Sequence, residues 1–215
     1  MLAEFQKTDR CIWFSHLDLQ RTMQRALRRA QLPIAYSQGF NPHAELSFAS
    51  ALPVGASSLC EILDVRLDGE LAPEAFVQAM NGVLPRGLRI CAARLVEGRF
   101  PAPMAKMAQA GYEALAFGAD LRQAARDFLA SQRFEVEKPS KGRVRQLDIR
   151  PMVQALDVEL QGEDSRLTLL VTCTNADNLK PELLLEALCP GGRFQVTRTR
   201  LLAQGGAPLF AWTEA

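Results

Sequence analysis

The stretch FSHLDLQRTMQRALRRAQLPIAYSQGFNPHAELSF, Phe14 to Phe48, decides the fold of the N-terminal half. Its apolar residues recur three or four positions apart and predict a helix over residues 16–31 with one buried face. These are Leu19, Met23, Ala26, Leu27 and Ala30. Ser15 is a good N-cap, and Asp18 three residues later suits the positive start of the helix.

The other side of this helix is cationic, because it carries Arg21, Arg25, Arg28 and Arg29. No acidic residue follows four positions after any of them to neutralise the charge. The pattern favours contact with an anion, such as a nucleic-acid backbone or an acidic partner. A solvated, solubilising face is the alternative.

A polar loop from Ser37 to His43 follows the helix. Gly39 permits backbone conformations that other residues avoid, and Pro42 biases its predecessor towards extended geometry. Hydrogen-bonding side chains are dense here: Tyr36, Ser37, Gln38, Asn41 and His43. This density favours a binding loop, and a structural turn whose Asn and Ser bond their own backbone is the alternative.

Composition places the chain among ordinary globular proteins. The 215 residues are 48% hydrophobic and 23% charged, with a net charge of +1. No apolar run reaches the length of about 18 residues that a membrane span needs, and the start, Met1-Leu2-Ala3-Glu4, does not resemble a secretory signal. We expect a cytoplasmic protein that does not contact a membrane.

The five cysteines are far apart and include no CxxC pair. This spacing argues against a disulfide framework, a zinc site or an iron–sulfur cluster. No cofactor is expected.

The order of the elements predicts an α+β protein made of two tandem ferredoxin-like (βαββαβ) domains. The domains are predicted at 1–98 and 111–215, with a linker at 99–110. In the first we expect a strand at 3–14, the helix, strands at 33–37, 46–48 and 59–67, a helix from Pro73 and a strand at 88–96. In the second we expect strands at 112–117 and 134–137, a helix from Asp120 between them, strands at 153–160 and 167–174, a helix at 181–188 and a strand at 194–202.

The second half carries its own basic loop, predicted after its second strand. Lys138, Lys141, Arg143, Arg145 and Arg150 surround a glycine, and Arg198 follows near the last strand. Such loops bind phosphate well, although a solvated hairpin is an equal alternative. If the two domains face each other, these basic elements form one cleft.

Several motifs resemble those of the radical-SAM-associated protein family, a bacterial domain of unknown function. They are Phe14–Asp18, Arg25–Ala30, Tyr36–His43, Leu52–Gly55, Leu147–Pro151 and Val196–Thr199. The family occurs alone or joined to cobalamin-binding radical SAM enzymes, often encoded near an RNase E/G-type ribonuclease and ribosomal-protein genes. The resemblance implies a radical SAM enzyme as partner, and it hints at RNA. Because this chain lacks a CxxxCxxC motif, that enzyme would be a separate chain.

Three hypotheses follow, and the first is a non-catalytic accessory protein that binds or presents an RNA substrate, tRNA or rRNA, through a basic cleft. Its candidate site comprises His16, Asp18, Arg21, Arg25, Arg28, Tyr36, Ser37, Gln38, Gly39, Phe40, Asn41, His43, Lys138, Lys141, Arg143, Arg145, Arg150 and Arg198. Tyr36 and Phe40 would stack on unpaired bases.

The second hypothesis is a protein-docking module that completes a radical SAM enzyme without touching RNA. The third is a metal-independent ribonuclease or transferase with His16 and His43 as acid and base. An architectural resemblance to tandem ferredoxin-like CRISPR RNA-processing endonucleases motivates the third. His16, Asp18 and His43 could instead hold a metal ion. A non-catalytic role is favoured over an enzymatic one.

Overall fold

The computed structural model describes residues 1–96, 103–140 and 143–211. The chain is a mixed α+β protein that divides into two compact units. Unit 1 comprises Met1–Met107 and Leu201–Ala215, and unit 2 comprises Ala108–Arg200. No helix in the described part of the chain is long and apolar enough to cross a membrane.

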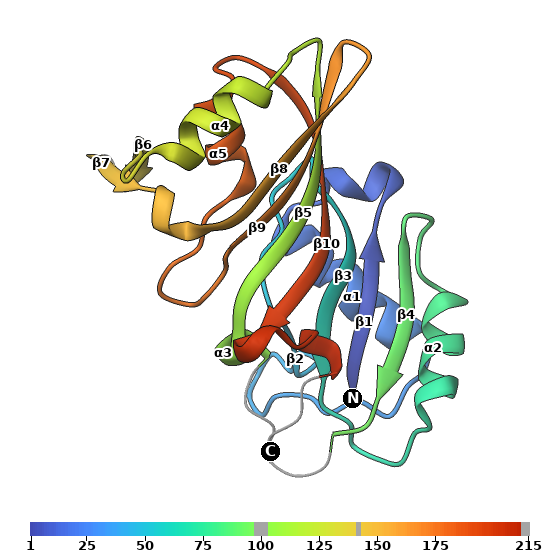
Figure 1. The fold of residues 1–215 in the computed structure, drawn as a ribbon. Coiled ribbons are helices and arrows are strands. Elements are labelled where there is room, and N and C mark those ends of the chain that lie inside the picture. The colour runs from blue at the N-terminus through green and yellow to red at the C-terminus, as the bar shows by residue number, and fades with distance from the viewer. Residues whose placement is uncertain (97–102, 141–142, 212–215) are drawn as a thin grey trace. The chain divides into compact units, whose positions relative to one another are not determined.

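Unit 1 contains a sheet with the strand order β4-β1-β3-β2, and each of these neighbouring pairs is antiparallel. Its strands and helices, in chain order, are β1 (Leu2–Lys7), α1 (His16–Arg29), β2 (Leu46–Phe48), β3 (Ser57–Val65), α2 (Pro73–Asn81) and β4 (Leu88–Arg94) (Figure 1). A 3-10 helix, Asp9–Trp13, links β1 to α1. The short helix α3 (Pro103–Lys106) and two 3-10 turns at Gln204–Gly206 and Leu209–Ala211 complete the described part of the unit.

Both long helices of unit 1 pack against the same face of the sheet. Their apolar stripes meet the alternate strand residues that point to that side, in one core. The core includes Leu19, Met23 and Leu27 of α1, Phe76 and Met80 of α2, and Ala3, Phe5, Leu63, Val65, Leu88 and Ile90 of the strands. The predicted stripe of α1 is confirmed, since Leu19, Met23, Ala26 and Leu27 are buried.

Unit 2 repeats this sheet order as β10-β5-β9-β8. Its main elements are β5 (Met107–Phe117), α4 (Arg122–Ala130), β8 (Val153–Gln161), β9 (Asp164–Thr172), α5 (Pro181–Leu188) and β10 (Arg193–Ala203). One face is apolar and buried, with Tyr112 opposite Leu169 and Ala114 opposite Leu167. The other face carries the exposed Arg166 and Thr168.

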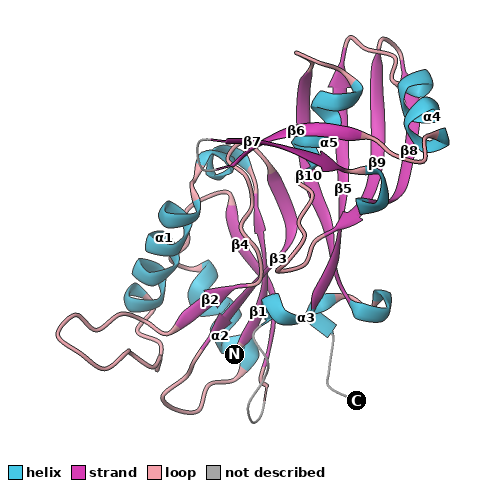
Figure 2. Cartoon of the chain, turned by 90° about the vertical axis from the view of Figure 1, so that its left-hand side faces the viewer, coloured by secondary structure: helices cyan, strands magenta, loops and turns pink. Residues whose placement is uncertain are grey.

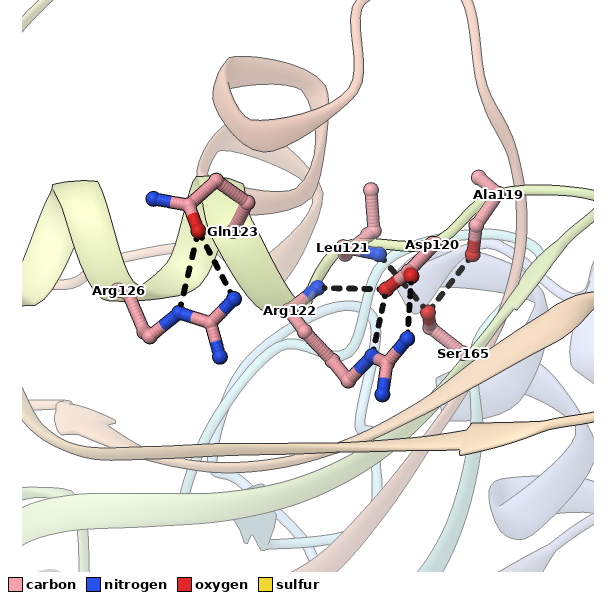
Figure 3. A network of polar contacts seen from close by, with 7 residues as sticks. All are labelled: Ala119, Asp120, Leu121, Arg122, Gln123, Arg126 and Ser165. Atoms are coloured by element: carbon pink, nitrogen blue, oxygen red, sulfur yellow. Dashed lines mark hydrogen bonds and ion pairs between the residues drawn. The ribbon is translucent and has the colours of Figure 1, made fainter.

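The start of α4 is fixed by two polar side chains (Figure 3). The buried Ser165 hydroxyl accepts a hydrogen bond from the Leu121 N–H at 2.9 Å and donates one to the Ala119 carbonyl at 2.7 Å. The Asp120 carboxylate accepts hydrogen bonds from the backbone N–H and the guanidinium of Arg122, which lower the pKa of Asp120 to about 2. Ser165 thus joins the entry of α4 to β9.

Two parts of the first predicted domain differ from the structure. Residues Cys11–Phe14 are not strand, because Asp9 has a φ of 49° and the Cys11 N–H bonds the Thr8 carbonyl, which starts the 3-10 helix. Residues 33–37 form only isolated bridges, Ile34 with Leu67 and Tyr36 with Ala44. The predicted linker 99–110 lies partly outside the described residues, and the rest forms α3 and the start of β5.

The predicted basic loop of unit 2 is mostly a β-hairpin. Strands β6 (Glu135–Ser140) and β7 (Arg143–Asp148) pair in a two-stranded sheet between α4 and β8. The hairpin is tied at its base, where the Asp148 carboxylate accepts hydrogen bonds from the Phe134 and Arg150 N–H groups at 2.9 and 3.1 Å. Setting this insertion aside, unit 2 has the same succession of elements as unit 1.

Candidate nucleic-acid interface

Helix α1 begins with a complete capping box, as Ser15 and Asp18 predict. The Asp18 N–H donates to the Ser15 hydroxyl at 3.2 Å, and the Asp18 carboxylate accepts from the Ser15 N–H and hydroxyl at 3.2 and 2.6 Å. These bonds from Ser15 lower the pKa of Asp18. Asp18 is therefore occupied as a helix cap rather than offered to a ligand.

Helix α1 lies at the outside of unit 1 (Figure 2). Its exposed side is an arginine ridge, formed by Arg21, Arg25, Arg28 and Arg29. All four residues are exposed, and none forms an ion pair with a carboxylate of the described residues. Two exposed arginines elsewhere in unit 1 do have carboxylate partners, since Arg66 pairs with Glu45 at 3.0 Å and Arg86 with Asp9 at 3.5 Å. Asp18 is near enough to Arg21 for an electrostatic attraction without a direct ion pair, so most of the ridge's positive charge is left for a ligand.

The last turn of α1 meets the base of the polar loop. The Arg28 guanidinium lies over the Tyr36 ring, 6.0 Å from its centroid, within the range of a cation–π contact. Tyr36 in turn bridges to Ala44 across the neck of the loop. The ridge and the loop predicted from sequence therefore form one continuous surface of unit 1.

Ser37 and His43 close the neck of the loop. The Ser37 N–H donates to the His43 carbonyl at 2.9 Å, and the His43 N–H donates to the Ser37 hydroxyl at 3.1 Å. The Ser37 hydroxyl also lies 2.9 Å from Nδ1 of His43. The alternative of a structural turn is partly confirmed, because Ser37 bonds the backbone of its own loop, and the binding role of the loop stays a prediction.

Beyond the neck, the loop exposes Gln38, Gly39, Phe40 and Asn41. Phe40 is fully exposed at the tip. Gly39 has a φ of 138°, a conformation that residues with a side chain rarely adopt. The loop thus presents an aromatic ring that packs against nothing in its own fold.

The two histidines belong to separate contacts. His16 packs edge-on against Phe48, with ring centroids 5.4 Å apart, whereas His43 bonds Ser37. No hydrogen bond or ring contact joins the two described imidazoles, which leaves the acid–base hypothesis without geometric support. His16, Asp18 and His43 do not gather into a metal site among the residues described.

Ser37 and His43 make a hydroxyl–imidazole pair, which in other settings activates a nucleophile. Here the pair sits on an exposed loop, and no carboxylate of the described residues bonds the second nitrogen of His43 to orient it. The bonds that it makes close the neck of the loop. Its role is structural.

Of the basic residues in the second half, the hairpin strands contain Lys138, Arg143 and Arg145. The register places Lys138 opposite Arg145 and Ser140 opposite Arg143. Arg145 is exposed, and Lys141 lies outside the described residues. The distal half of this arm is thus basic, and its base carries Glu135, Glu137 and Asp148.

Arg150 is a structural residue rather than a surface ligand. Its guanidinium donates to the Leu129 and Val153 carbonyls at 3.1 and 3.3 Å and lies over the Phe128 ring. These contacts hold the connection into β8 against the end of α4. The prediction that Arg150 binds RNA conflicts with this packing.

Arg198 is buried, with 1% of its surface exposed, on the same face of β10 as Val196. It donates from Nε and Nη2 to the Tyr112 hydroxyl at 3.1 and 3.0 Å. The prediction that Arg198 binds RNA is therefore wrong for the folded chain, because the side chain lies in the core of unit 2. Alternation along the strand, rather than charge, decides which way this residue points.

Two features were not predicted from the sequence. Trp13, Leu17 and Val54 of unit 1 are apolar yet exposed, at 66, 58 and 56%, and the Trp13 ring lies beside Gly55. In unit 2, a hollow of about 230 Å³ on the open sheet face is lined by Glu113, Ala114, Leu115, Gln161, Arg166, Gln195 and Thr197. One indication of the exposed apolar residues was present in the sequence, because Leu17 lies off the buried stripe of α1.

Comparison with known proteins agrees with a mixed α+β fold. The chain is similar to a chain in a crystal structure of a Cbf5-Nop10-Gar1 complex, with a TM-score of 0.51 and 15% identity. The similarity covers 93% of this chain and 48% of that one, so this chain spans about half the length of its structural neighbour. At this identity the similarity shows the fold alone.

No curated protein matches the chain. A family model described as "Uncharacterized protein conserved in bacteria (DUF2344)" matches residues 1–181, which is most of the sequence. The chain therefore belongs to this bacterial family of uncharacterized proteins.

Proposed function

We propose that this protein is a non-catalytic RNA-binding accessory protein, and that the arginine ridge of α1 is its phosphate-binding surface. The observation that carries the proposal is a set of four exposed arginines on one helix, none of which forms a direct ion pair with a carboxylate of the described residues. Phosphate contacts from Arg supply most of the affinity of nonspecific nucleic-acid binding. Arg also matches the geometry of phosphate oxygens.

The spacing of the ridge suits an extended polyanion. Arg21, Arg25 and Arg28 follow one another at intervals of four and three residues, which corresponds to roughly 6 and 4.5 Å along the helix axis. They therefore form a row on one side of α1 rather than a cluster. A row of guanidinium groups contacts successive phosphates along a backbone, whereas a cluster suits one small anion.

The resemblance of the motifs in Phe14–Asp18 and Tyr36–His43 to radical-SAM-associated proteins supports a cytoplasmic radical SAM enzyme, on a separate chain, as the partner. On this proposal the protein holds tRNA or rRNA for that enzyme. We also infer that both units are ferredoxin-like, because each has two helices and a four-stranded sheet with its first and third strands in the centre.

Binding of fluorescently labelled RNA to the purified protein tests the RNA role. A variant with Arg21, Arg25 and Arg28 changed to Ala should lose most of the binding. The matched control changes Arg66, Arg86 and Arg133 to Ala, which removes the same charge from arginines that are paired with Glu45, Asp9 and Glu135. Equal loss in both variants would show a general charge effect and would count against the ridge.

The exposed Trp13, Leu17 and Val54 favour a second candidate function, docking of a protein partner. Exposed large apolar side chains often mark protein interaction sites, and Trp is common at the centre of interfaces. Docking through apolar contacts should persist at high salt, whereas phosphate binding should not. Changing Trp13 to Ala should weaken binding of a co-purified radical SAM enzyme while leaving RNA binding by the ridge unchanged.

A further inference from the structure

We propose that the loop from Ser37 to His43 makes this interface selective for unpaired RNA, with the Phe40 ring stacking on an exposed base. The inference rests on the proposed function, because it assumes that the arginine ridge holds the phosphates. It adds the class of RNA that the surface accepts.

Phe40 is the first observation. Its side chain is fully exposed, so it contributes no burial to the fold. It is flanked by exposed polar residues, Gln38 and Asn41, rather than by the neighbours of an apolar patch. A lone aromatic ring among hydrogen-bonding groups is suited to a planar partner with polar edges, and a nucleobase has both features.

The closed neck is the second observation, because it holds the tip in place. Ser37 and His43 are joined by three hydrogen bonds: one between their side chains, one from the His43 N–H to the Ser37 hydroxyl, and one between their backbones. Gly39 adopts the φ of 138° that turns the chain just before Phe40. The ring is therefore presented on a braced loop, which lowers the entropy lost when a base stacks on it.

The contact between the Ser37 hydroxyl and Nδ1 of His43 is compatible with either tautomer of the imidazole, because a hydroxyl can donate or accept. In both cases the contact joins the two sides of the neck, and the exposed ring of His43 lies at the base of the loop.

The distance between loop and ridge is the third observation. Phe40 lies three positions after Ser37, a separation of at most about 10 Å even in a fully extended chain. The neck itself adjoins the ridge through the Arg28–Tyr36 contact. A strand whose phosphates lie on the ridge thus brings its bases within reach of Phe40.

Paired RNA does not offer the same contact. In a duplex the faces of the bases are covered by their neighbours, and sequence-independent binding uses phosphates and 2′-hydroxyls. Stacking on Phe40 requires a base whose face is free. The geometry therefore favours single-stranded tails, loops or bulges over helical RNA.

The test measures binding of two RNA probes to the whole 215-residue chain. One is an unstructured strand of about 12 nucleotides, within the roughly 4 to 16 that one small domain covers, and the other is a duplex of the same length. The variants are Phe40→Ala, Phe40→Trp and, as a control, Phe117→Ala, which removes a partly exposed phenylalanine of unit 2. Circular dichroism verifies that each variant is folded.

We expect the single strand to bind more tightly than the duplex. Phe40→Ala should weaken single-strand binding roughly 5- to 100-fold, the range of one lost base stack, and leave duplex binding unchanged. Phe40→Trp should bind the single strand as tightly as wild type, because Trp also stacks on a base, and Phe117→Ala should bind both probes like wild type.

Equal affinity for both probes, or full single-strand affinity in Phe40→Ala, would overturn this inference while leaving the arginine ridge as an RNA-binding surface. Failure of the wild-type protein to bind either probe would instead overturn the proposed function itself.

Discussion

The cap of α1 is the residue-scale feature on which the arginine ridge depends. The Ser15 hydroxyl accepts the Asp18 N–H and, with the Asp18 carboxylate, forms the capping box of this helix. Ser15→Ala should therefore destabilise the protein by about 1 kcal/mol. Urea unfolding followed by circular dichroism measures this loss. Ser15→Thr, which keeps the hydroxyl that bonds Asp18, should retain most of the stability, and a variant Ser15→Ala as stable as wild type would contradict the assigned capping box.

Gly87 is a second residue whose replacement the backbone does not tolerate. Its φ is 96°, and a Cβ added there would lie 2.5 Å from the Thr8 carbonyl oxygen and 3.1 Å from the Cys11 sulfur. Backbone atoms at that distance must move. Gly87→Ala should cost about 1 to 3 kcal/mol or more, measured by the same unfolding experiment. Gly118→Ala is the control for the positive φ alone, because nothing lies within 4 Å of its added Cβ.

Replacing Arg198 tests whether this arginine stabilises the fold or binds RNA. Because its guanidinium is buried against Tyr112, Arg198→Ala removes packing and leaves the tyrosine hydroxyl without these two donated bonds. We expect a loss of about 3 kcal/mol in the free energy of unfolding. RNA affinity of the folded fraction should not change. If the variant were as stable as wild type but bound RNA more weakly, Arg198 would contact RNA and its structural role would be contradicted.

At the scale of elements, α4 depends on its attachment to β9. Ser165→Ala would leave the buried Leu121 N–H without its acceptor, which should cost about 1 to 3 kcal/mol. Thr168→Ala, at an exposed position of the same strand, is the control and should stay within about 0.5 kcal/mol of wild type. Thermal unfolding of both variants under identical conditions compares them. Equal stabilities would show that water replaces the Ser165 hydroxyl.

The entry of α4 should also respond to acid. Hydrogen bonds from Arg122 lower the pKa of Asp120 from 3.8 to about 2, so ionised Asp120 contributes stability above pH 3.8. This contribution is lost as the pH falls from 3.8 through about 2. The difference in stability between wild type and Asp120→Asn should therefore be constant near neutral pH and shrink over that interval. Because the pair is exposed, the difference will be small. A difference that grows in acid would contradict the assignment.

Helices with a strong apolar period were the most predictable elements. The stripe of α1 fixed its buried face, and Pro73 and Pro181 mark the first residues of α2 and α5. The strand predicted at 3–14 was wrong for Cys11–Phe14. An apolar, aromatic run is typical of a strand, but the backbone turn at Asp9 directs the chain into a 3-10 helix. For β6–β7, the sequence predicted a short strand at 134–137 and left a hairpin as the alternative to a phosphate-binding loop, and the charged residues of β7 hid the alternation of the second strand.

At the scale of the whole molecule, the candidate site was predictable in unit 1 and poorly so in unit 2. The arginine ridge and the loop are adjacent in sequence, so local spacing was enough to place them on one surface. Arg150 and Arg198 depend on contacts with residues distant in sequence, Leu129 and Tyr112. A count of positive charge does not distinguish such residues from exposed ones.

The salt dependence of RNA binding is the measurement that tests the arginine ridge most directly. For a single strand, the slope of log K against log salt is about −0.7 for each phosphate neutralised. Changing Arg21, Arg25 and Arg28 to Ala should therefore reduce the steepness of the slope by about 2 and weaken binding at low salt. The control variant at Arg66, Arg86 and Arg133 should keep the wild-type slope. An unchanged slope in the ridge variant would contradict the account, because the phosphates would then lie elsewhere on the protein.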